Sequence, residues 1–86
     1  MKLKPDFITH TANGEAILVP VGGSEFSGIV RGNATFGAIL DCLKRECSEA
    51  DIVAELQNRY DAPEEAIVRD VEKALFELRS IGALDE

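Results

Sequence analysis

The chain has 86 residues, an apolar fraction of 45% and a net charge of −7. A chain of this length forms one domain that buries only about 60% of its unfolded surface, which leaves little room for a deep active-site cleft. The acidic excess repels phosphate backbones, and this argues against nucleic acid as a partner.

The first third of the chain is expected to form three short strands. Asn13-Gly14 is a strong two-residue hairpin signal, and it lies between two β-prone segments that predict strands near 6–11 and 15–21. Residues 25–31 form a predicted third strand. Its short length and internal glycine place it at an edge of the sheet.

The remaining two thirds predict three helices. The first covers about 35–46, with Asn33 or Thr35 as its N-cap and apolar residues spaced i, i+3, i+4 and i+7 from Phe36 onward. Ser48 with Asp51 is a variant capping box that opens a second helix at about 49–60.

A third helix is predicted at about 62–81. Asp61 with Glu64 is interpreted as its capping box, and Gly82 supplies a C-terminal stop. At 100° per residue, one arc of this helix is the predicted core face and contains Ile67, Val71, Ala74, Leu75, Leu78 and Ile81. Beside this arc lies a mixed flank of Val68, Glu72, Phe76 and Arg79. Either Phe76 packs on the strands, or this flank is the floor of a groove that accepts an extended segment of another chain.

These elements predict an α+β, winged-helix-like fold, in which a three-stranded antiparallel sheet precedes three helices within a single domain, residues 1–86. The helical part, residues 35–86, has six Lys and Arg against thirteen Asp and Glu and so carries the whole negative charge. We see no apolar run long enough to span a membrane and no signal peptide, and we expect a cytoplasmic protein.

Motifs of catalysis are not found in the sequence. His10 is the one histidine, and nothing ties it to a partner; Cys42 and Cys47 are five apart, a spacing that suits neither a local disulfide nor a metal site, so free thiols are expected. No P-loop, GxGxxG or HExxH occurs. We therefore expect no enzyme activity, no metal and no cofactor.

An exposed edge strand needs a physical reason, because unpaired N–H and C=O groups pair readily with other chains. An edge beside an apolar helix flank is what strand addition of a peptide requires. The same edge leaves open a homodimer.

Several segments together resemble the PqqD family, the peptide-recognition elements of pathways that modify ribosomally made peptides. The resemblance covers nearly the whole chain and rests on residues 32–43, 48–56, Tyr60-Asp61, Asp70-Val71, Ala74-Leu75, Leu78 and Gly82-Ala83-Leu84. The sequence departs from the family at Gly32, where a leucine is usual, and at Leu40, where a tryptophan is common.

The resemblance implies a peptide-binding chaperone without catalytic activity. A precursor's leader peptide would add as a strand to the third strand and pack against the third helix, and a modifying enzyme such as a radical SAM maturase would be the second partner. Carried over to this sequence, the peptide-binding residues are Phe26, Ser27, Gly28, Ile29 and Val30 in the strand and Val68, Arg69, Glu72, Phe76 and Arg79 in the helix.

Two other functions compete with this one. A winged-helix DNA-binding regulator has a compatible arrangement of elements, but the charge of the helical part opposes it. A structural subunit would stabilise a maturase without touching the peptide.

Overall fold

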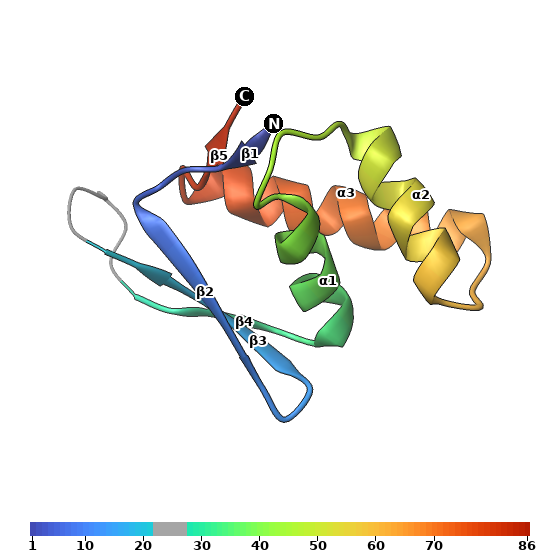
Figure 1. The fold of residues 1–86 in the computed structure, drawn as a ribbon, viewed down its shortest axis with the longest axis horizontal. Coiled ribbons are helices and arrows are strands. Elements are labelled where there is room, and N and C mark those ends of the chain that lie inside the picture. Colours follow the sequence, from blue (N-terminus) through green and yellow to red (C-terminus); the bar gives the residue numbers. More distant parts are fainter. Residues whose placement is uncertain (22–27) are drawn as a thin grey trace.

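The structure is a computed structural model that describes residues 1–21 and 28–86 (Figure 1). Strands β2 (Phe7–Ala12), β3 (Glu15–Pro20) and β4 (Val30–Gly32) form an antiparallel sheet in the order β2-β3-β4. Helices α1 (Ala34–Cys42), α2 (Glu49–Arg59) and α3 (Glu64–Ser80) follow and lie together on one side of that sheet. The predicted α+β class, with a three-stranded sheet followed by three helices, is confirmed.

The β2–β3 hairpin forms where the sequence predicts it. Asn13 and Gly14 both have positive φ, at 54° and 76°, which is the backbone that a tight two-residue hairpin turn needs. The turn closes the pair Ala12 and Glu15, and the register continues without interruption to Phe7 and Pro20.

Strand β4 begins later than predicted and ends one residue later. Gly28 and Ile29 lie outside the strand, and residues 22–27 lie outside the described part of the chain. Gly32, which follows the predicted strand, is its last residue and pairs with Ala16. A Cβ at Gly32 would overlap the Phe36 side chain. The strand can therefore approach α1 this closely because the position has no side chain.

Helix α1 is capped as predicted but ends at Cys42, four residues early. The Asn33 side chain accepts a hydrogen bond from the Phe36 N–H at 3.0 Å. At the other end the Leu43 carbonyl accepts from the Leu3 N–H, and the Cys47 N–H donates to the Met1 carbonyl, both at 2.9 Å. The N-terminal segment therefore takes backbone groups that a longer helix would use itself.

The two following helices differ in how they begin. Ser48 and Asp51 form the predicted capping box of α2, with the Asp51 carboxylate accepting from the Ser48 N–H at 2.9 Å and the Ser48 hydroxyl accepting from the Asp51 N–H at 3.1 Å. The predicted Asp61 cap of α3 is wrong. Pro63 is the N-cap and has no side-chain hydrogen bond. The residue before a proline is held away from helical geometry, so a helix that starts at residue 62 is disfavoured.

The core lies between the inner face of the sheet and the helices. From the sheet, Phe7, Ala16 and Leu18 are buried. From α3, the predicted core face is buried at Ile67, Val71, Ala74, Leu75 and Leu78, while Ile81 is half-buried.

The two ends of the chain form a pair that was not predicted. Strand β1 (Lys2–Leu3) is antiparallel to β5 (Leu84–Asp85), so the termini lie side by side (Figure 1).

Candidate functional site

Strand β4 is one edge of the three-stranded sheet. It pairs with β3 through Leu18 and Val30, Ile17 and Arg31, and Ala16 and Gly32, and the described part of the chain offers it no partner on the other side. Backbone N–H and C=O groups of successive residues in a strand point to alternate sides. At least one of the three β4 residues therefore directs both groups outward.

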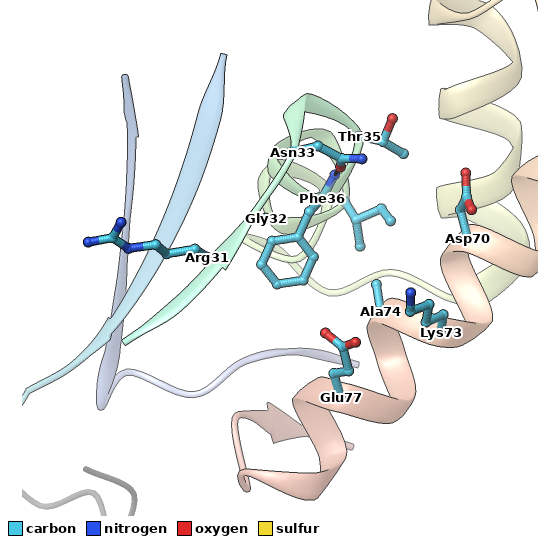
Figure 2. A pocket seen from close by; sticks show the side chains of 10 residues that line it. Arg31, Gly32, Asn33, Thr35, Phe36, Asp70, Lys73, Ala74 and Glu77 are labelled. Atoms are coloured by element: carbon cyan, nitrogen blue, oxygen red, sulfur yellow. Dashed lines mark hydrogen bonds between the residues drawn. The ribbon is translucent and has the colours of Figure 1, made fainter. Parts of the chain in front are cut away.

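A pocket of about 220 Å³ lies between β4, the start of α1 and α3 (Figure 2). Three buried apolar side chains form its floor: Phe36 and Ile39 from α1, and Ala74 from α3. The Phe36 ring points into the space between β4 and α3 (Figure 2). Its position follows from the bare backbone of Gly32 beneath it, since any side chain there would displace the ring.

The rim of this pocket is polar. Asn33 and Thr35 contribute from the start of α1, and Arg31 and Gly32 from β4. The Arg31 side chain, however, extends across the sheet and away from α3 (Figure 2). It accordingly adds its charge to the outer face of the sheet more than to the pocket.

Helix α3 supplies three exposed charges to the rim, Asp70, Lys73 and Glu77. Within residues 1–21 and 28–86, none of the three takes part in an ion pair. Their spacings of three and four residues would allow pairing, as in Asp41 with Lys44 at 3.3 Å on α1. These three charged groups are therefore available to a ligand in the pocket.

The predicted strand residues lie only partly in the described chain. Phe26 and Ser27 fall outside it. Gly28 and Ile29 precede β4 and are exposed, with Ile29 at 56%. Val30 is the first residue of β4 and is half-buried.

The predicted helix residues lie on the flank of α3 that does not line this pocket. Val68, Arg69 and Glu72 border a separate shallow hollow with Glu64 and Glu65. Phe76 is 70% exposed, and Arg79 forms an ion pair with Glu86 at 2.9 Å. At 100° per residue these positions lie on one side of the core face, and Asp70, Lys73 and Glu77 on the other. Their part in peptide binding stays a prediction.

Sequence reasoning therefore missed the α3 residues nearest β4. Asp70, Lys73 and Glu77 border the predicted core arc just as the other flank does, and Ala74 was assigned to the core alone. The two flanks differ only in which of them faces the sheet. This depends on how α1 packs between the sheet and α3.

The two cysteines and the histidine of the chain are not among the described residues that line this pocket. Burial raises the pKa of the Cys42 and Cys47 thiols, which favours their protonated form. The Cys47 thiol donates to the Cys42 carbonyl at 3.4 Å. His10 lies exposed on β2. Among the described residues no group of three His, Cys, Asp or Glu side chains could hold a metal ion, and no helix has the length and apolar character to cross a membrane.

Residues 15–84 match the family model described as "Coenzyme PQQ synthesis protein D (PqqD)". Two solved structures share the fold. One is described as "TbiB1 in Complex with the TbiA(beta) Leader Peptide", with a TM-score of 0.74, 18% identity, and 99% of this chain and 100% of that chain covered. The other is described as "Lasso peptide synthetase B1 complexed with the leader peptide", with a TM-score of 0.73, 20% identity, and coverage of 95% and 93%. No curated protein matches the sequence.

Proposed function

Because this chain belongs to the PqqD family, whose model spans residues 15–84, we propose that it is a non-catalytic module that binds the leader of a ribosomally made precursor peptide. The leader adds as a strand to the free edge of β4 and is presented to a modifying enzyme such as a radical SAM maturase. The module acts in the cytoplasm. Catalysis belongs to the partner enzyme.

One observation supports this most directly: β4, which has no partner on its outer side among the described residues, runs beside a pocket with an apolar floor. An added strand lies about 4.8 Å from its neighbour, and its side chains alternate between the two faces of the sheet. On the helix side, every second peptide side chain therefore points toward Phe36, Ala74 and α3. Ladder hydrogen bonds supply affinity, and the pocket supplies selectivity.

The comparisons support the same reading. The two solved structures named above are both described as complexes with a leader peptide. They cover nearly the whole of this chain, so the sheet edge and the helices beside it are part of what is shared.

Holding the leader would act on the reaction through proximity. A bound leader keeps the rest of the precursor tethered near the maturase, which converts a second encounter into an intramolecular one. Effective concentrations in the millimolar range are typical of short flexible tethers, so the module raises turnover at low precursor concentration without contributing a catalytic group.

The peptide-binding residues are Val30, Arg31 and Gly32 for the ladder and Phe36 and Ala74 for the pocket. The predicted set on the other flank of α3, which includes Val68, Glu72 and Phe76, would be contacted only by a peptide that continues around the helix. Phe76→Ala and Lys73→Ala are a matched pair of variants, because both side chains are exposed on the same helix. The variant with the weaker affinity for the leader identifies the flank of α3 that the peptide contacts.

The test is a titration of ¹⁵N-labelled protein with the synthetic leader of a precursor encoded near the gene, with a scrambled peptide as the control. We expect binding at about 10 μM or tighter and amide shifts concentrated at residues 30–32, with smaller shifts along the neighbouring strand β3. Absence of binding, or shifts that spare residues 30–32, would contradict the proposal.

A further inference from the structure

We propose that the pocket beside β4 selects a leader that carries a basic side chain two residues from an apolar anchor, and that Glu77 is the residue that binds the basic group. This inference rests on the proposed leader binding and names the chemistry of the peptide.

Glu77 is placed to bind a cationic group of the peptide. Its side chain points from α3 toward the Phe36 ring, across the space between β4 and α3 (Figure 2). The residue is exposed, and it forms no ion pair in the described part of the chain. A carboxylate at the mouth of an apolar pocket, without a cation of its own, is a site for a cationic group of the ligand.

The spacing of an added strand fits this arrangement. Alternate residues of a strand lie about 6.8 Å apart on the same face. Ala74 and Glu77 are three residues apart on α3, which is about 4.5 Å along the helix axis. One peptide side chain can therefore rest on Phe36 and Ala74 while the next one on the same face reaches the Glu77 carboxylate.

The other charges near the pocket also favour a positively charged group of the ligand. Lys73 is the opposing charge, but it lies between Asp70 and Glu77, so the charged residues that α3 contributes to the pocket sum to −1. Arg31 points away from α3 (Figure 2). The whole chain carries −7, and such a field speeds the approach of a basic peptide and slows that of an acidic one.

The experiment is a selection from a display library of short random peptides, made in parallel on the wild-type protein, on Glu77→Lys and on Glu65→Lys. Glu65 is the matched control, because it lies exposed on the same helix and borders the separate hollow. We expect peptides with Lys or Arg two residues from an aliphatic or aromatic residue to be enriched on the wild type and on Glu65→Lys. On Glu77→Lys the preference should change to Asp or Glu.

The best wild-type peptide is then resynthesised with its basic residue replaced by Gln. Exposed charge pairs contribute modestly, so we expect about two- to fivefold weaker binding at low salt and a smaller difference at high salt. Enrichment of peptides without a basic residue at that spacing, or the same preference on Glu77→Lys as on the wild type, overturns the inference and leaves leader binding intact. Failure to enrich any peptide that shifts the amides of residues 30–32 overturns the proposed function, and the inference with it.

Discussion

Replacing Gly32 by alanine should damage the fold and the pocket together. A Cβ at residue 32 would lie 2.5 Å from the Phe36 Cγ and 2.6 Å from its Cβ. Ordinary carbon contacts are about 3.5–4.0 Å, so Phe36 must move by about 1 Å. Phe36 is only 7% exposed, and rotation of the ring alone does not relieve the contact with its Cβ. We expect the free energy of unfolding to fall by about 1–3 kcal/mol, as for other overpacked sites.

Urea denaturation of Gly32→Ala measures this loss, and Gly37→Ala is the matched control. At Gly37, inside α1, a Cβ would meet the Ala16 methyl group at 3.2 Å, a contact that a shift of a few tenths of an ångström relieves. Alanine also gains about 1 kcal/mol of helix propensity there, so we expect a change near zero or a small gain. Equal stability of Gly32→Ala and wild type would refute the reasoning, as would an unchanged Phe36 ring environment in its NMR spectrum.

Other predictions address the core, a helix cap and the thiols. Leu75→Ala, at a side chain with no exposed area, should lower the free energy of unfolding by about 2–5 kcal/mol. Phe76→Ala, at a side chain that is 70% exposed, should change it by less than about 0.5 kcal/mol. Urea denaturation of the two variants measures both changes. The pKa of Asp51 is lowered chiefly by the hydrogen bond from the Ser48 backbone N–H. The Asp51 carboxylate therefore stabilises the fold above the pKa of the unfolded chain, and this stabilisation is lost as the pH falls through the lowered pKa of the folded protein. Thermal melts of Asp51→Ala should match those of the wild type in acid and show a lower Tm at neutral pH. Burial raises the pKa of Cys42 and Cys47, and iodoacetamide at neutral pH should alkylate both more slowly in the folded protein than in urea; equal rates would show that both thiols are accessible.

Local structure could be predicted well from the sequence. Asn13-Gly14 adopts the two positive φ angles that its hairpin requires, and Ser48 with Asp51 forms the capping box that the spacing indicates. Residues 67–78 of α3 bury the face that the helical periodicity marks. These features depend on neighbours within a few residues, so a single sequence is enough to find them.

What the sequence could not supply depends on contacts between distant segments. Helix α1 ends early because Leu3 bonds the Leu43 carbonyl, a contact across the whole N-terminal half. The α3 flank that faces β4 depends on the packing of α1, and Gly32 is explained by the Phe36 ring above it. The pairing of β1 with β5 joins segments that are too short to show a periodic pattern.

Because β1 pairs with β5, the chain could be circularly permuted, so that the same elements follow one another from a different starting point. Lys2 and Asp85 are direct neighbours across an antiparallel pair, where facing Cα atoms are about 5 Å apart, so a linker of a few glycines and serines could close the backbone into a ring. Reopening that ring at the exposed Asn13-Gly14 turn would give a circularly permuted module whose new ends lie at the tip of the hairpin. Such a permutant offers a second point of attachment for a fused enzyme while keeping β4, α1 and α3 as they are.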